Sequence, residues 1–382
     1  MNSLSKSLRT VLLLLFAVSL VLVVLFAASH DRTIIDFVQY WAGAKLLLSG
    51  GDPYRVSAIA ELERTLWPEI DTILLWNPPL IALIITPLGL LDYGVARALW
   101  LVVESALYLS SAALAINFFS AAQKKYERLI YLITFYPALL SIHDGQVTPF
   151  ILIGLTLFII FEFGNSYRPF VAGLALSLTL IKPHLLYLVY LFIAWRAVRT
   201  SQYKTALGVT FGGVILGAFP LIFNPNIYTL YFNALNEPPF YWQTPTLGSF
   251  LQGAMGSHPQ FYRFLPTALG ALLALIWLVW SGARFDGTRV LLTLIPLSLV
   301  SSPYGWVFDQ ILLLPVGIFL LGALRSALAR GILIGGNIVM ASLPGSLGQQ
   351  FFVWYPALYI LVIGLLYGSS FISRNDREPE RA

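Results

Sequence analysis

A succession of apolar stretches, separated by short polar breaks, runs along almost the whole chain. Of the 382 residues, 58% are hydrophobic and only 11% are charged, whereas soluble domains carry roughly 25% charged residues. A soluble fold cannot hide this much apolar surface, but a lipid bilayer can. The sequence therefore predicts an all-α polytopic membrane protein.

The number and direction of the spans follow from two rules. About 20 apolar residues are needed to cross a bilayer, and Lys and Arg gather on the cytoplasmic side. Together they predict about twelve transmembrane helices, with both termini cytoplasmic and the first apolar run retained as a helix rather than cleaved as a signal peptide. The expected spans are 11–28, 94–119, 126–141, 146–163, 169–181, 184–197, 205–223, 263–282, 288–301, 306–322, 331–344 and 350–370.

The segment 76–91 is ambiguous, because it is apolar but short and Pro87 interrupts it. If it crossed the membrane, the basic residues Lys124, Lys125 and Arg128 would lie outside. We therefore place 76–91 at the outer interface, which leaves those three residues inside.

Long loops and a charged tail complete the expected organisation. We expect one membrane-embedded domain over 1–372, with outer loops at 29–75 and 224–262, and a disordered cytoplasmic tail at 373–382. The first loop contains two stretches that can form helices, 36–49 and 55–66, with a Gly- and Pro-containing break between them.

Several functional classes have no support in the sequence. The chain has no cysteine, which excludes disulfides and thiolate metal sites. His and carboxylate residues show no tight metal-ligand spacing, and no nucleotide-binding or serine-hydrolase motif is present. The net charge of +5 fits a basic cytoplasmic face better than nucleic-acid binding. We expect neither a metal nor a cofactor.

Asp36 is the candidate general base, since a carboxylate beside the membrane can take a proton from an attacking hydroxyl. It can equally cap the helix expected from residue 37. Lys182, at a break before Pro183, can bind a phosphate with His184 as a further donor, or it can simply extend to the interface.

Two further breaks carry polar groups at the expected outer ends of helices. His143 and Gln146 can bind sugar hydroxyls or a phosphate, although Asp144–Gly145 is also a common turn dipeptide. Asp309 can pair with Lys182, and Trp306 can stack on a sugar ring. Ionisable residues at membrane depth are costly, which makes them functional candidates.

These stretches, in this order, resemble glycosyltransferase family 87, whose members have a GT-C-type fold and include polyprenol-phosphate-mannose-dependent mannosyltransferases of mycobacteria. The resemblance covers about residues 10–320. The matching segments are Asp36–Ala44 with Gly51–Tyr54, Asn77–Pro79 with Thr86–Leu88, Gly145–Pro149, Ala172–Gly173 with Ile181–His184, and Ser302–Asp309.

The resemblance implies an inverting transfer of a sugar, mannose or another hexose, from a polyprenyl-phosphate donor to a lipid or glycan acceptor on the outer face of the cell membrane. It implies that Asp36 is the base and that the donor phosphate or sugar contacts a set of polar and aromatic residues. Some members carry a His after the Trp of the last motif, where this chain has Phe308–Asp309, so no His role is carried over there. The expected donor residues are Lys182, His184, His143, Gln146, Tyr304, Trp306 and Asp309, and those expected to support the acceptor or the loop are Tyr40, Tyr54 and Arg55.

Three other classes remain open from the residues alone. A transporter or flippase would show inverted repeats and ionisable groups near the membrane centre, and no repeat is evident. A purely structural protein would not need Lys182 at a helix break. An acyltransferase or polysaccharide polymerase would share an outer-face site.

Overall fold

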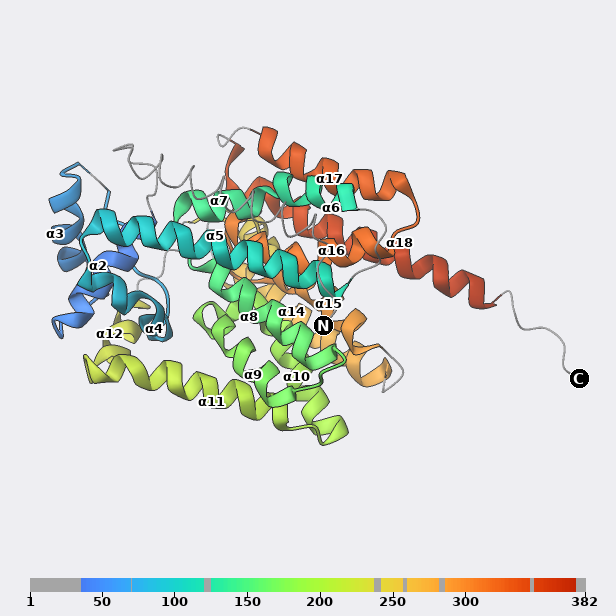
Figure 1. The fold of residues 1–382 in the computed structure, drawn as a ribbon, viewed down its shortest axis with the longest axis horizontal. Coiled ribbons are helices and arrows are strands. Elements are labelled where there is room, and N and C mark those ends of the chain that lie inside the picture. Colours follow the sequence, from blue (N-terminus) through green and yellow to red (C-terminus); the bar gives the residue numbers. More distant parts are fainter. Residues whose placement is uncertain are drawn as a thin grey trace, which may run out of the picture. The chain divides into compact units, whose positions relative to one another are not determined.

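The computed structural model describes residues 36–69, 71–119, 125–236, 242–256, 260–281, 286–343 and 347–375, and every regular element in these ranges is a helix (Figure 1). The all-α expectation is confirmed for this part of the chain, while the expected first span, 11–28, lies outside it. The chain divides into two compact units, and the expected single membrane-embedded domain stays a prediction. Unit 1 comprises Met1–Leu114, Ala138–Pro183 and Arg196–Phe240, and unit 2 comprises Ala115–Pro137, His184–Trp195 and Tyr241–Ala382.

Unit 1 begins with the two helices expected in the first long loop, α2 (Phe37–Leu48) and α3 (Val56–Leu66). They are joined by a turn in which Gly50 has φ +69°, a conformation that glycine adopts without strain. The Asn224 side-chain amide donates to the Gly51 carbonyl at 2.8 Å and so fastens this turn from a distant part of the chain.

The ambiguous segment forms three short helical pieces, η1 (Pro79–Ile81), α4 (Ala82–Ile85) and η2 (Thr86–Leu90). They pack on α2: Trp41 Nε1 donates to the Leu91 carbonyl at 3.0 Å, and Lys45 Nζ donates to the Gly89 carbonyl at 3.3 Å. A Cβ on Gly89 would lie 2.8 Å from the backbone of Ala44, so the contact requires glycine. This stretch is therefore tied to the first long loop.

The remaining helices of unit 1 approach each other closely at glycines. A Cβ on Gly173 would lie 2.0 Å from the Thr205 carbonyl oxygen, and one on Gly208 would lie 2.2 Å from that of Phe170. Small residues of this kind let membrane helices pack backbone to backbone, as α9 and α11 do (Figure 1). The helices are α5 (Tyr93–Phe118), α7 (Tyr136–Asp144), α8 (Thr148–Phe163), α9 (Pro169–Leu176), η3 (Ser177–Ile181), α11 (Lys204–Ala218), η5 (Phe219–Ile222) and α12 (Ile227–Ala234), and both α5 and α7 extend into unit 2.

Unit 2 contains a buried hydrogen-bond network among polar side chains. The Tyr131 and Tyr359 hydroxyls lie 2.6 Å apart, and Tyr355 bonds both Tyr359 and Asn337. The helices of this unit are α6 (Lys125–Thr134), η4 (Pro183–Leu186), α10 (Tyr187–Thr200), α13 (Leu247–Ala254), α14 (Phe261–Ser281), α15 (Gly287–Ser301), η7 (Val307–Leu313), α16 (Leu314–Ala323), α17 (Ala327–Ser342), η9 (Gln349–Val353) and α18 (Trp354–Asn375).

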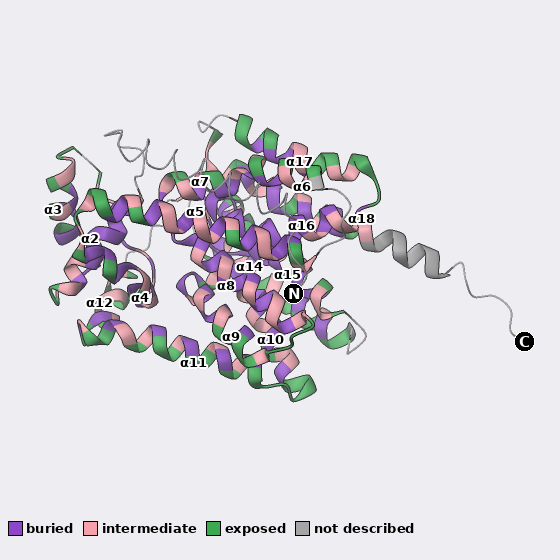
Figure 2. Ribbon diagram, viewed as in Figure 1, coloured by how far each residue is buried: buried purple, intermediate pink, exposed green. Residues whose placement is uncertain are grey.

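Four stretches of helix in the described ranges are long and apolar enough to cross a membrane: Tyr93–Phe118, Lys204–Ile222, Phe261–Trp280 and Gln349–Leu366. Six more apolar helices have 10–17 residues. Figure 2 shows α11 as a series of buried and exposed positions, and large apolar side chains of α11 and α14, such as Phe211 and Leu273, are exposed. Apolar surface of this extent is typical of a lipid contact. The membrane assignment stands, while the number twelve stays a prediction.

Three details differ from the expectations. The helix expected over 126–141 breaks at Phe135 into α6 and α7, because Pro137 cannot continue the preceding helix. The loop expected at 224–262 contains helices α12 and α13. The tail was expected from residue 373, but α18 runs to Asn375, and 376–382 lie outside the described residues.

Candidate functional site

Asp36 stands immediately before α2, at the position from which a carboxylate often caps a helix. Its side chain makes no capping hydrogen bond to the first turn. Instead, one carboxylate oxygen accepts a hydrogen bond from the Gln146 Nε2 amide at 2.5 Å. The structure therefore shows Asp36 directed to a residue 110 positions away rather than to its own helix.

Gln146 connects Asp36 with two other predicted residues of unit 1. Its Oε1 atom accepts hydrogen bonds from the Tyr40 hydroxyl at 3.2 Å and from Lys182 Nζ at 3.3 Å. Gln146 is only 3% exposed, and Lys182 is 9% exposed. The donor end of one buried amide thus faces a carboxylate, and its acceptor end faces an ammonium group, as the chemistry of the amide requires.

The turn that carries Gln146 is held in place by Trp100 of α5. Gly145 has φ +72°, which allows the sharp bend between α7 and α8. The Trp100 indole nitrogen donates to the Gly145 carbonyl at 2.9 Å. The Trp100 ring also packs on Phe37, Tyr40 and Phe150, with ring centroids 5.1 to 5.8 Å apart. One buried indole therefore positions both the turn and the start of α2.

Lys182 follows η3 and precedes Pro183, which breaks the helix. Its backbone nitrogen donates to the Thr179 carbonyl at 3.2 Å, so the chain closes a last tight turn before the side chain reaches Gln146. A buried ammonium group is costly and is a functional candidate at membrane depth. The alternative that Lys182 extends to a solvated interface does not fit its burial.

His143 and Asp144, at the end of α7, form a pair with His143 Nδ1 and Asp144 Oδ1 2.8 Å apart. The His143 side chain is 52% exposed and the Asp144 side chain 25% exposed. The pair lies two to three residues before Gln146, and about half of the His143 side chain is exposed.

Tyr54 and Arg55 differ in their surroundings. The Tyr54 hydroxyl donates to the Asn77 carbonyl at 3.0 Å, and its ring packs on Tyr231. Burial, with a smaller effect of the neighbouring tyrosines and Asp52, raises the pKa of Tyr54, so the phenol stays neutral and supports the loop. Arg55 is exposed.

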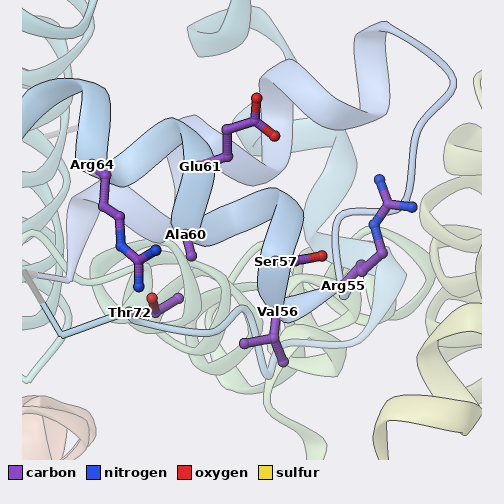
Figure 3. A pocket seen from close by; sticks show the side chains of 7 residues that line it. All are labelled: Arg55, Val56, Ser57, Ala60, Glu61, Arg64 and Thr72. Carbon is purple, nitrogen blue, oxygen red and sulfur yellow. The ribbon is translucent and has the colours of Figure 1, made fainter.

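Arg55 lines a hollow of about 800 Å³ along α3, shown in Figure 3. Arg64 lines the same hollow from the last turn of the helix, together with the Ser57 and Thr72 hydroxyls. In the view of Figure 3, the Arg64 guanidinium extends toward Thr72, while the Glu61 carboxylate points to the other side of the helix. The lining of the hollow therefore includes two guanidinium groups, two hydroxyls and one acidic residue, Glu61.

The other predicted residues belong to unit 2. Asp309 accepts a hydrogen bond from the Trp306 backbone nitrogen at 2.9 Å and so caps η7. The Trp306 ring packs on Trp242, with centroids 5.3 Å apart. The Tyr304 ring lies 4.6 Å from the Arg263 guanidinium. His184 is half-buried in η4.

Three buried acids of unit 1 were not among the sequence candidates, and one of them, Glu162 of α8, pairs with Arg196. Glu104 lies within the apolar α5, and Glu63 lies on the covered face of α3; both are 0% exposed. Burial raises the pKa of Glu63 to about 7, although a hydrogen bond from the Ile73 backbone nitrogen lowers it. A single carboxylate in an otherwise apolar span is the signal that would have identified Glu104.

No group of three or more His, Asp or Glu side chains able to hold a metal occurs in the described part of the chain. The expected absence of a metal and of a cofactor stays a prediction.

Comparison with known proteins gives the family. The sequence profile of glycosyltransferase family 87 matches residues 75–303, more than half of the chain. The match includes Gln146 and Lys182, whereas Asp36 and Trp306 lie outside it. Comparisons with curated proteins and with solved structures gave no match. The profile match nevertheless shows that the chain belongs to glycosyltransferase family 87 and is a membrane glycosyltransferase.

Proposed function

We propose that this glycosyltransferase moves a hexose, mannose in the first instance, from a polyprenyl-phosphate donor to a hydroxyl of a lipid or glycan acceptor on the outer face of the membrane. Asp36 acts as the general base, and the anomeric carbon is inverted. The observation that supports this most directly is the Gln146 amide, which binds the Asp36 carboxylate at one end and the Lys182 ammonium group at the other.

The reaction needs a base and a cation with separate tasks. The acceptor oxygen attacks the anomeric carbon while its proton passes to Asp36, and the bond from that carbon to the phosphate oxygen breaks. The leaving polyprenyl phosphate keeps the bonding electron pair, and Lys182 stabilises its negative charge. A single displacement of this kind inverts the anomeric carbon.

Gln146 keeps these two charges from neutralising each other. Without the amide, an aspartate and a lysine in a poorly solvated site would form a direct ion pair, which would weaken both base and phosphate binding. With the amide between them, Asp36 remains a proton acceptor and Lys182 remains directed to an anion. His143 is proposed to contact the sugar, and the donor role expected for His184, Trp306, Tyr304 and Asp309 of unit 2 stays a prediction.

The acceptor is proposed to use the hollow along α3. Arg55 and Arg64 form no ion pair with a carboxylate among the residues that the structure describes. Two guanidinium groups beside hydroxyls suit a phosphate-bearing headgroup. An Arg64→Gln variant is then expected to raise KM for a phosphate-bearing acceptor and to leave KM for the donor unchanged.

The test is transfer by purified protein in liposomes supplied with a radiolabelled polyprenyl-phosphate hexose. We expect transfer by the wild type, a loss of about 1,000-fold or more for Asp36→Asn, and a raised donor KM for Lys182→Gln. The matched controls are Asp71→Asn and Lys204→Gln, which change exposed residues of the same types.

Two outcomes would contradict the proposal. Full transfer by Asp36→Asn would exclude Asp36 as the base. Efficient transfer from a nucleotide sugar in liposomes lacking polyprenyl phosphate would exclude a lipid-linked donor.

A further inference from the structure

Arg128 of α6 is a buried cation whose guanidinium group has one unpartnered edge. Arg128 is only 4% exposed, and its Nε and Nη2 atoms have no hydrogen-bond partner among the residues that the structure describes. These two nitrogens lie on the same edge of the planar group, the edge that holds two oxygens of a carboxylate or a phosphate at once. A charged group buried without a partner is costly, so this edge calls for a ligand.

The protein's own acids do not fill this role. Three acids occur in the described part of unit 2, and each is engaged elsewhere. The Glu127 carboxylate accepts a hydrogen bond from Arg330 Nε at 2.6 Å. Asp286 and Asp309 cap α15 and η7. The counter-charge of Arg128 therefore has to come from another molecule.

The Glu127–Arg330 pair holds the helices around this edge. It joins α6 to α17 (Figure 1), and Arg330 also donates to two carbonyls of the turn between α16 and α17, at 3.0 and 2.9 Å. At the end of α16, a Cβ on Gly322 would lie 3.2 Å from Arg128 Nη2. A side chain at position 322 would press on the guanidinium group, so glycine leaves space beside the unpartnered edge.

The setting favours a phospholipid as the source of the anion. The basic residues at this end of unit 2 are among those expected on the cytoplasmic side, where anionic headgroups attract them. Tyr126 and Leu328, two residues before Arg128 and Arg330, are exposed. Exposed aromatic and aliphatic side chains next to basic ones are typical of a membrane interface, where lipid headgroups supply phosphate.

We propose that the Nε and Nη2 atoms of Arg128 bind the phosphate group of a membrane phospholipid beside Gly322. Two phosphate oxygens accept hydrogen bonds from the two nitrogens, and the negative charge of the phosphate balances the guanidinium group. Both nitrogens are covered in the structure, so the phosphate enters with a small rotation of the Arg128 side chain. This binding involves no sugar donor and does not depend on the proposed function.

The test is the melting temperature of the purified full-length protein, delipidated in a maltoside detergent, as a function of added phosphatidylglycerol. Lipid that binds the folded state raises this temperature, and its concentration dependence gives an apparent dissociation constant. We expect Arg128→Gln to raise that constant about tenfold, because a bidentate charged contact is lost. Arg128→Lys, which keeps the charge but not the planar edge, should lie between the two. Arg289→Gln, at an exposed arginine of the same unit, is the control.

A second variant leaves the charge in place. Gly322→Ala adds the Cβ that crowds Nη2, and we expect it to weaken phosphatidylglycerol binding while Arg128 is unchanged. Should Arg128→Gln not fold, this variant carries the test. Diacylglycerol, which has no phosphate, should not raise the melting temperature of the wild type.

The melting temperature without lipid separates a ligand site from a cation that the protein itself holds. We expect Arg128→Gln to melt no lower than wild type under this condition, because an unbalanced buried charge is removed. A lower melting temperature together with an unchanged response to lipid would overturn the proposal. So would unchanged lipid binding in Gly322→Ala, and equal stabilisation by inorganic phosphate alone would exclude a lipid as the ligand.

Discussion

Each unit contains a polar cluster around a buried cation, and the two cations differ in the partners that they bond. In unit 1, Lys182 bonds a neutral amide whose other end bonds Asp36. In unit 2, Arg263 is 1% exposed and is held by the protein itself. Its Nε donates to the Gln252 side chain at 2.6 Å, another nitrogen donates to the Trp242 carbonyl, and the guanidinium lies over the Tyr304 ring.

The difference agrees with the proposed role of Lys182 as the cation that binds the donor phosphate. Arg263 joins the segment around Trp242 and α13 to the start of α14, and a Cβ on Gly248 of α13 would lie 2.0 Å from the Arg263 carbonyl oxygen. A cation with this many fixed contacts stabilises the fold. The unit 1 cluster keeps a carboxylate and an ammonium group apart on one amide, which is the arrangement that the proposed binding and proton transfer require.

The largest expected effect comes from removing the Gln146 amide, which distinguishes the unit 1 cluster from that of unit 2. We expect Gln146→Leu to lower kcat about 100-fold, because Asp36 and Lys182 lose their common partner and their geometry. The measurement is transfer in liposomes, and Gln260→Leu, at an exposed position, is the control. Activity within twofold of wild type would show that the amide does not organise the site.

Removing the guanidinium of unit 2 should affect stability instead. We expect Arg263→Met to lower the free energy of unfolding by about 2 kcal/mol, because Gln252 and the Trp242 carbonyl lose a charged donor. Activity per folded molecule should stay near wild type. Thermal unfolding in detergent measures the first effect, with exposed Arg325→Met as the control. A large loss of kcat without a loss of stability would instead assign this cluster to substrate binding.

Glu63 is a buried acid of unit 1 to which we assign no role in the transfer reaction, and its effect on stability depends on pH. Burial raises its pKa to about 7, against about 4.3 in an unfolded chain. The folded state therefore binds the proton more tightly than the unfolded chain does. The stability that the bound proton adds is fully present below about pH 4 and is lost as the pH rises through about 7. We expect wild type to lose about 3 kcal/mol of stability over this range relative to Glu63→Gln.

The measurement is the unfolding temperature in detergent from pH 4 to 8, with Glu69→Gln as the control. Parallel curves for wild type and Glu63→Gln would show that Glu63 is not held as an acid by the fold.

The smallest expected effect comes from one hydroxyl. Tyr40→Phe removes the hydrogen bond to Gln146 Oε1 but keeps the ring that packs on Trp100. One hydrogen bond is worth about 1 kcal/mol, so we expect kcat to fall about fivefold. Tyr203→Phe, at an exposed position, should have no effect in the same assay. An unchanged kcat in Tyr40→Phe would mean that Lys182 alone orients the amide.

Several elements could be predicted because their signals are local. Helices α2 and α3, the short helices beside Lys182 and the turn at Gly145 follow from apolar runs and from Gly and Pro positions. Asp36, Gln146 and Lys182 were identified as separate candidates on the same grounds. Helices α12 and α13 were missed, because Pro and aromatic residues near them concealed short helical runs.

The sequence by itself determined that this chain is helical, that it belongs in a membrane and which polar residues interrupt its apolar runs. These properties depend on composition and on neighbours along the chain. Only the tertiary structure decided that Asp36 bonds Gln146 instead of capping α2, and that Lys182 shares the same amide. Such contacts join residues tens of positions apart, and packing, not local preference, brings them together.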